Sequence, residues 1–151
     1  MSVQGKIIWG AAVILTGIQF FQPSQNRTEK VADTHIERLY VVPENVRTML
    51  ARSCYDCHSN HTRYPWYSRI QPGAWFMAEH IKEGKGELNF SSFGEYSLRK
   101  QRSKFTAMSG QVNDGEMPLP SYTLIHRDAV LTRGEQQVLM EWFDAMADSL
   151  K

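Results

Sequence analysis

Two scarcities narrow the functions open to this 151-residue chain. Basic charge is not in excess, because 17 Lys and Arg residues stand against 16 Asp and Glu residues, and Lys6 is the only charged residue among the first 25. The rest of the chain is neutral in sum and offers no broad cationic field, so we expect no nucleic-acid binding. Cysteine is limited to Cys54 and Cys57. Because there is no second Cys pair, the sequence cannot complete the four-ligand structural zinc site that two pairs would form.

Internal repeats and low-complexity runs are also absent, and the only strand-like pattern is LYVV at 39–42. With 42% hydrophobic and 22% charged residues, the composition is that of an ordinary globular protein. Apolar residues at helical spacing predict an all-α fold. The last helix should begin at a capping box of Thr132 and Glu135. We expect helices over 43–54, over 74–84 (ended by Gly84 and Gly86), from about 95 into 109–116, and from 132 to 146, with loops over 59–73 and 114–122.

The first 25 residues form a separate segment. The stretch from Ile7 to Phe21 is almost wholly apolar, and as a helix it would be about 22 Å long against a hydrocarbon core of about 30 Å. Counting from Val3, with Lys6 extending toward the headgroups, brings the length close to a span. We therefore expect residues 1–25 to be an uncleaved membrane anchor oriented with its N-terminus inside. A cleaved secretory signal is the alternative, although FFQPSQNR contains no A-x-A pair. Residues 26–42 are expected to be a polar tether, and 43–151 the domain.

The cysteines belong to the motif C-x-x-C-H, formed by Cys54, Cys57 and His58. A disulfide would close so short a loop that it adds little stability, and it leaves the histidine unexplained. A thioredoxin-like redox pair would require a βαβ unit, which the sequence lacks. Covalent haem attachment explains all three residues, since two thiols on a helical turn can add to the two haem vinyl groups and the next histidine then lies under the iron. We expect haem c at Cys54 and Cys57, with His58 as an iron ligand.

The second axial ligand is less clearly specified. Met117 lies in the proline-locked loop GEMPLP, whose rigidity suits a weak thioether ligand because little ordering entropy is lost on binding. His80 is the strongest rival, and it can also be a half-exposed helix residue beside Glu79 and Glu83. The other histidines are His35, His61 and His126, and His61 is too close to His58 in sequence to reach the opposite haem face easily. We expect the core to contain Met49, Met108, Met140 and Met146.

A haem pocket also needs aromatic walls and donors for the propionates. Trp66, Tyr67 and Arg69 offer an indole N–H, a phenol and a guanidinium within four positions. Alternatively, Trp66 and Trp75 are core residues and Arg69 is solvated. The basic run RKQRSK, at 99–104, is expected to be the wet face of a helix, with a docking patch for an acidic redox partner as the minority interpretation.

Several segments, in order, resemble the exported haem-binding domain family, a branch of the monohaem c-type cytochromes. They are CYDCH, TRYPWYSRIQPGAW, LNFSSF, GEMPLPSY and LTRGEQQVLMEWFDAM, and the resemblance covers roughly Pro43 to Met146. It implies a cytochrome c-like helical domain around one covalently bound haem. By the same resemblance, Cys54 and Cys57 are the thioether sites, His58 the proximal ligand and Met117 the distal ligand, and the haem pocket is lined by Arg63, Trp66, Tyr67 and Arg69.

The expected function is that of a monohaem c-type cytochrome, tethered to the inner membrane on its periplasmic side and passing single electrons to redox proteins or a membrane respiratory assembly. His/Met ligation would leave no coordination site for a substrate, and no nucleophile–base pair adjoins the motif, so we expect no enzymatic activity. Two alternatives are a haem-based ligand sensor or weak peroxidase, and a structural haem subunit of a membrane assembly. We further expect the outer ring nitrogen of His58 to bond a backbone carbonyl near Pro72.

Overall fold

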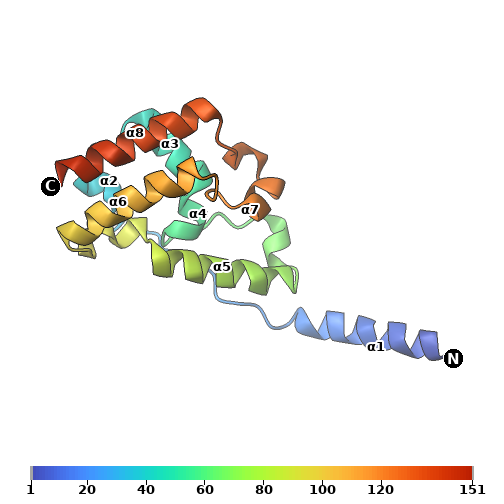
Figure 1. The fold of residues 1–151 in the computed structure, drawn as a ribbon. Helices are drawn as coiled ribbons and strands as arrows, with labels where there is room; N and C mark the ends of the chain where they lie inside the picture. Colours follow the sequence, from blue (N-terminus) through green and yellow to red (C-terminus); the bar gives the residue numbers. More distant parts are fainter. Residues whose placement is uncertain (1, 151) are drawn as a thin grey trace.

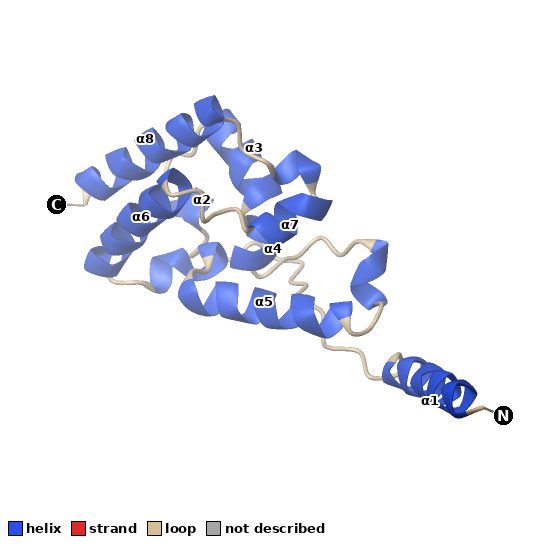
Figure 2. Cartoon of the chain, turned by 45° about the vertical axis from the view of Figure 1, so that its right-hand side comes forward, coloured by secondary structure: helices blue, strands red, loops and turns tan. Residues whose placement is uncertain are grey.

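The computed structural model describes residues 2–150, and this part of the chain is helical (Figure 2). Within it, the only β-type pairing is an isolated bridge between Arg27 and His61. The all-α expectation is therefore confirmed. The elements are α1 (Val3–Ile18), α2 (Ile36–Leu39), α3 (Glu44–Ser53), α4 (Tyr55–His58), η1 (Trp66–Arg69), α5 (Gly73–Glu87), η2 (Phe90–Glu95), α6 (Leu98–Asn113), α7 (Pro120–Ile125), η3 (Arg127–Ala129) and α8 (Arg133–Ser149).

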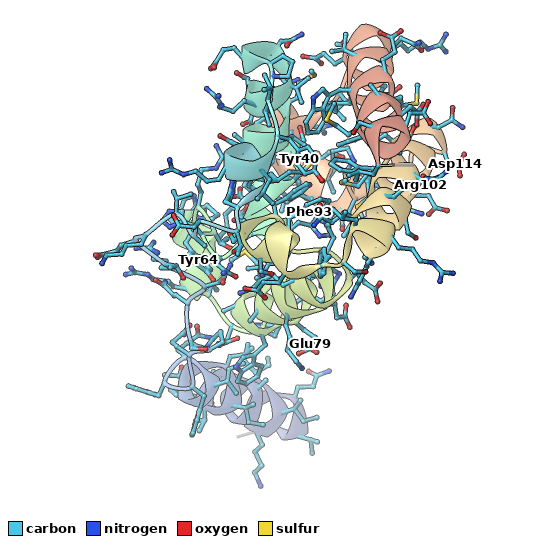
Figure 3. The ribbon with its side chains drawn as sticks, turned by 90° about the vertical axis from the view of Figure 1, so that its left-hand side faces the viewer. Tyr40, Tyr64, Glu79, Phe93, Arg102 and Asp114 are labelled. Atoms are coloured by element: carbon cyan, nitrogen blue, oxygen red, sulfur yellow. The ribbon has the colours of Figure 1, made fainter. Side chains whose placement is uncertain are left out.

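The core forms where α6 and α8 pack side by side (Figure 1). Phe105 of α6 is fully buried, and its ring meets Trp142 of α8 edge to face, with centroids 5.8 Å apart. Tyr40 and Phe93 extend this aromatic cluster toward α2 and η2, as the labelled side chains in Figure 3 show, with ring centroids 6.2 Å apart. Aromatic side chains bury the largest apolar area per residue, so this cluster supplies much of the hydrophobic stabilisation of the domain.

Specific hydrogen bonds fix the start of α8 and the end of α6. At the start of α8, Thr132 Oγ1 accepts the Glu135 N–H, and Glu135 accepts the Thr132 N–H, which confirms the capping box. At the end of α6, Gly115 (φ 69°) follows the C-cap Asp114. The N–H groups of Gly115 and Glu116 bond the carbonyls of Val112 and Gln111 at 3.2 and 3.0 Å. This is a Schellman motif, and the chain leaves α6 in a fixed direction because of it.

Two details differ from the sequence-based expectation, and the one strand-like pattern is not a strand. Helix α5 continues through Gly84 and Gly86 to Glu87, because two glycines weaken a helix by only about 1 kcal/mol each and packing outweighs that cost. The LYVV stretch is not a strand, since Leu39 ends α2. The loops expected over 59–73 and 114–122 contain the short helix η1 and the start of α7, which has Pro120 in its first turn.

The N-terminal helix α1 projects away from the domain (Figure 1) and buries none of its residues. Within residues 2–150, no helix combines the length and hydropathy needed to cross a membrane. The stretch that follows α1 packs on the domain: the Asn26 N–H donates to Tyr64 Oη at 2.7 Å, and Ile36 and Val42 are buried in the core. Figure 3 shows Tyr64 beside this passing segment. The interval expected to be a tether therefore contributes core side chains in its second half.

Candidate haem site

The C-x-x-C-H motif lies on a single helical turn between two helices. Cys54 ends α3 by donating its N–H to the Leu50 carbonyl, and its own backbone (φ −129°, ψ −45°) breaks the helix before α4 begins. The N–H groups of Cys57 and His58 then both bond the Cys54 carbonyl, at 3.2 and 2.9 Å. This turn brings two free thiols and the imidazole close together. The geometry of the motif is therefore set by backbone bonds centred on Cys54.

The imidazole of His58 is oriented by two carbonyl groups of the next helix. Its Nδ1 atom lies 2.8 Å from the Gly84 carbonyl oxygen and 3.1 Å from that of Leu88, at the end of α5. Carbonyl oxygens accept only, so we assign the proton to Nδ1, and Nε2 keeps its lone pair. A neutral imidazole in this tautomer is ready to bind a metal. The expectation of a carbonyl near Pro72 was wrong, because α5 runs past Gly84 and its C-terminal carbonyls lie against α4.

Gly84 lets α4 and α5 approach closely enough for this bond. A Cβ atom at Gly84 would lie 3.1 Å from the carbonyl oxygen of Cys57 and 3.4 Å from its Cβ. The first contact is tighter than packed atoms normally allow, so a side chain here would push the helices apart. Gly84 was expected to end this helix. It instead allows α5 to pack directly against the C-x-x-C-H motif.

Two adjoining cavities surround the motif, and together we call them the α4 cleft. Their volumes are about 330 and about 300 Å³. Both are lined by His58 and Met117, while Cys54 lines the first and Cys57 the second. The structure thus brings together all four residues expected to hold haem through its thioethers and its iron. The other residues common to both cavities are Ser53 and Glu87.

The end of α6 directs Met117 into the α4 cleft. Its backbone N–H bonds the Gln111 carbonyl at 3.2 Å, immediately after the Schellman motif at Gly115. Met117 is half-buried and is followed by a cis bond to Pro118. This residue is thus fixed by its own backbone, without relying on packing as the core methionines do. Met49 and Met108 are buried in the core, as expected, although Met108 also lines the first cavity.

Among the histidines, His80 shares the α4 cleft with Met117. It lies on α5, lines the second cavity, and its Nδ1 atom is 2.9 Å from the Phe76 carbonyl oxygen, which leaves Nε2 free. His35, His61 and His126 do not line the cleft. His126 Nε2 instead bonds the Tyr67 hydroxyl. The candidates for a second iron ligand in the α4 cleft are therefore Met117 and His80. Met117 stays the prediction because it lines both cavities of this cleft.

None of the four residues expected to line the haem pocket lines the α4 cleft. Trp66 is 79% exposed and Arg69 is also exposed. Tyr67 and Arg63 line a third cavity of about 210 Å³, which shares Cys57, His80, Leu119 and Tyr122 with the second. The walls of the first cavity come from residues that the sequence analysis had not singled out as pocket residues: Leu88, Phe90, Lys104, Val112 and Phe143.

A buried carboxylate inside the motif was also missed. Asp56 is only 6% exposed, and its Oδ2 atom accepts the Tyr122 hydroxyl at 2.7 Å and an Arg63 N–H at 3.2 Å. Burial, followed by the bond to Asp56, raises the pKa of Tyr122 far above its usual value, so the phenol stays a donor. The same carboxylate raises the pKa of Arg63. A buried charge needs such partners, and this network ties α4 to α7.

The thiols are protonated at neutral pH. Burial raises the pKa of Cys54 to about 12 and that of Cys57 to about 11. Thiol–disulfide chemistry and zinc binding both require thiolates, which a lowered pKa favours. These two cysteines have the opposite character, so the redox-pair interpretation is not supported by their surroundings.

The α4 cleft fits a haem by the chemistry of its walls. Haem is a large apolar plate with two carboxylates, and the cleft offers apolar side chains together with a half-buried ammonium, Lys104, for a carboxylate. It also contains an oriented imidazole, a thioether and two thiols. A helical domain with such a site belongs to the class of haem-binding proteins.

The family follows from comparison with known proteins. The model of the haem-binding domain family matches residues 13–145, which is most of the chain. The protein is therefore a member of the haem-binding domain family, and the resemblance drawn from its motifs is confirmed. No curated protein and no solved structure shows significant similarity to it.

Proposed function

We propose that the protein is a monohaem c-type cytochrome, with haem bonded to Cys54 and Cys57 and ligated by His58 and Met117. One observation carries the proposal: the His58 ring, held at Nδ1 by Gly84 and Leu88, lines the same cleft as both thiols and Met117. Burial raises the pKa of both thiols, which disfavours the two thiolate-dependent uses of this pair, disulfide exchange and zinc binding.

The proposed role is single-electron transfer without catalysis. Haem iron changes between two oxidation states, and methionine as an axial ligand raises its potential relative to two histidines. In this chain, His58 would supply the fixed iron ligand, and Met117 would supply a second one from a loop held by the end of α6. Leu88, Phe90 and Phe143 give the first cavity apolar walls. An iron closed on both sides suits a carrier.

The place proposed for this carrier is the periplasmic side of the inner membrane, with α1 embedded in the bilayer and a redox protein or respiratory assembly as partner. The support is that α1 is almost wholly apolar, carries only Lys6 as a charge, and buries none of its residues against the domain. If α1 stays on the mature chain, the protein should sediment with membranes and resist salt or alkali. A mature N-terminus beyond Phe21 would show a removed signal.

Absorption spectra of the oxidised and reduced protein test the proposed ligands. A weak far-red band of the oxidised form should report a sulfur–iron bond, and it should vanish in Met117→Ala. Persistence of that band in the variant would exclude Met117 as the ligand.

A further inference from the structure

We propose that an aromatic surface beside α1 docks the domain onto the phospholipid bilayer and fixes its orientation there. This aromatic surface consists of Phe20, Phe21, Ile70, Trp75 and Phe76. The inference rests on the embedding of α1 proposed above and adds to it a second point of membrane contact, on the domain itself.

The side chains of the aromatic surface are unusually open to solvent. Phe20 and Phe21 are 83% and 69% exposed, and Phe76, Ile70 and Trp75 are 63%, 49% and 42% exposed. Large apolar groups gathered at one place on a soluble domain mark an interaction site. Residues 19–25 and 70–78 contain no charged residue, so this surface can leave water without stripping a charge.

Gln71 connects the two segments that carry the aromatic surface, residues 19–21 and 70–76, through hydrogen bonds. Its backbone N–H donates to Gln19 Oε1 at 3.0 Å, and its carbonyl accepts from Gln19 Nε2 at 3.3 Å. Its side-chain Nε2 donates to the Phe21 carbonyl at 2.7 Å, and its Oε1 accepts the Trp75 N–H at 3.2 Å. Gln71 is only 3% exposed. Four bonds to one buried residue hold the end of α1 against the start of α5.

Trp75 and the last residue of η1 add further hydrogen bonds between the domain and the segment that follows α1. The indole Nε1–H of Trp75 also donates to the Phe21 carbonyl, at 2.9 Å, and Gln22 Nε2 donates to the Arg69 carbonyl at 3.1 Å. In Figure 1, α1 leaves the domain directly beside the first turn of α5. The position of α1 therefore determines the position of the aromatic surface on the domain relative to the membrane.

The occupant we propose is a bilayer, because an embedded α1 would bring this surface to it. Sixteen residues make a helix about 24 Å long, shorter than a hydrocarbon core of about 30 Å. A short embedded segment draws its flanking residues toward the membrane. At the C-terminal end of α1 those flanking residues are Phe20 and Phe21. The hydrogen bonds from Gln71 and Trp75 to Phe21 would bring Trp75 and Phe76 toward the membrane with them. Aromatic side chains at this position are typical of the membrane–water interface.

Photolabelling from the lipid tests the proposal. Full-length, haem-loaded protein is reconstituted into phosphatidylcholine vesicles that contain a phospholipid with a diazirine near its glycerol backbone, and labelled peptides are identified by mass spectrometry after flotation. We expect label on α1 and severalfold more label on 70–76 than on two control sites that are equally open but distant in sequence. Those sites are Val41, 90% exposed, and Leu98, 64% exposed.

Two matched variants isolate the aromatic surface. Ile70→Ser with Phe76→Ser changes exposed side chains that make none of the bonds to residues 19–22, so the fold should persist, and label on 70–76 should fall severalfold while the protein still floats with the vesicles. Leu98→Ser should leave the labelling unchanged. Label confined to α1, or spread equally over 70–76, Val41 and Leu98, would overturn the docking while α1 remained embedded. Protein that does not float with vesicles would overturn both the docking and the membrane placement, leaving the haem chemistry untouched.

Discussion

The Nδ1 atom of His58 lies 2.8 Å from the carbonyl oxygen of Gly84, a residue at which a Cβ atom would lie 3.1 Å from the Cys57 carbonyl oxygen. One glycine thus determines two things: how closely α5 approaches the motif, and how the proximal imidazole is held. An acceptor on the far ring nitrogen raises the basicity of a metal-bound histidine. Residues outside the C-x-x-C-H motif would therefore tune an iron bound at His58.

Gly84→Ala should destabilise the haem-loaded protein. Overpacking against Cys57 costs roughly 1–3 kcal/mol, and it exceeds the gain of about 1 kcal/mol in helix propensity. The displaced carbonyl should also weaken the bond to His58 and shift the reduction potential. Denaturant unfolding and a redox titration measure the two effects.

Gly86→Ala is the control for this change. It lies in the same helix, and a Cβ there meets nothing within 4 Å. We expect equal or greater stability, by up to about 1 kcal/mol, and an unchanged potential. Equal stability and equal potential in the two variants would show that the close packing of α5 against the motif does not depend on Gly84.

Gly115→Ala should disturb the distal ligand from a distance. At φ 69°, a side chain costs roughly 1–2 kcal/mol, and relief of that strain would break the Schellman motif that directs Met117. The far-red band should weaken, whereas Gly110→Ala, with open space around its Cβ, should keep it. An unchanged band in Gly115→Ala would contradict this role of the turn.

Met117→Ala should keep its haem but lose its carrier properties. The thiols and His58 are untouched, so attachment persists, while the open iron should bind carbon monoxide readily in the reduced state and show a lower potential. Rapid-mixing absorbance measures the binding. Wild-type protein that binds carbon monoxide as fast as the variant would favour a sensor or peroxidase instead.

Met49→Ala is the appropriate control for Met117→Ala. Met49 is 4% exposed in the core, away from the α4 cleft, so its loss should cost roughly 2–5 kcal/mol of stability and leave the carbon monoxide rate unchanged. Met108 is less suitable because it lines the first cavity. His80→Ala, measured in the same way, tests the bis-histidine alternative.

The start of α8 should give the protein a pH-dependent increment of stability. The backbone N–H of Thr132, with smaller contributions from its hydroxyl and from Arg52, lowers the pKa of Glu135 below its ordinary value of 4.5. A lowered folded-state pKa means that this stabilisation is present above about pH 4.5 and is lost as the pH falls through the folded value. The stability gap between wild type and Glu135→Gln should therefore close in acid. Thr132→Ala should cost about 0.5–2 kcal/mol.

A control on the same helix separates capping from general charge effects. Glu141→Gln removes an exposed carboxylate that accepts only the Gln137 amide, and we expect it to change stability little at any pH. Thermal unfolding from pH 3 to 7 gives all three comparisons. A gap for Glu135→Gln that does not depend on pH would contradict a role for its charge.

Local patterns explain which features the sequence could predict. Thr132 and Glu135 cap a helix three residues apart, and Cys54, Cys57 and His58 share one turn, so spacing alone identifies them. The fixed loop that contains Met117 was predictable too, because prolines beside a methionine indicate a rigid loop, while its role as a ligand stays a prediction. Each of these features depends on neighbours within a few positions.

Contacts between distant residues explain what the sequence could not predict. The partner of Asp56 is Tyr122, 66 positions away, and neither residue type signals the other. Gly84 has the residue type that ends helices, and only its closeness to Cys57 shows why it lies inside one. Ile36 is buried although its neighbours are polar. Such residues are specified by packing, which local sequence does not report.

We propose that Cys54 and Cys57 bind haem covalently beside His58, and the intact mass of the denatured protein tests this attachment most directly. For protein made in a host that attaches haem c, we predict the mass of the chain plus one haem, retained after acid and organic solvent, and the mass of the chain alone for Cys54→Ala with Cys57→Ala. A wild-type protein that shows only the chain mass and releases its haem to the solvent would contradict the claim.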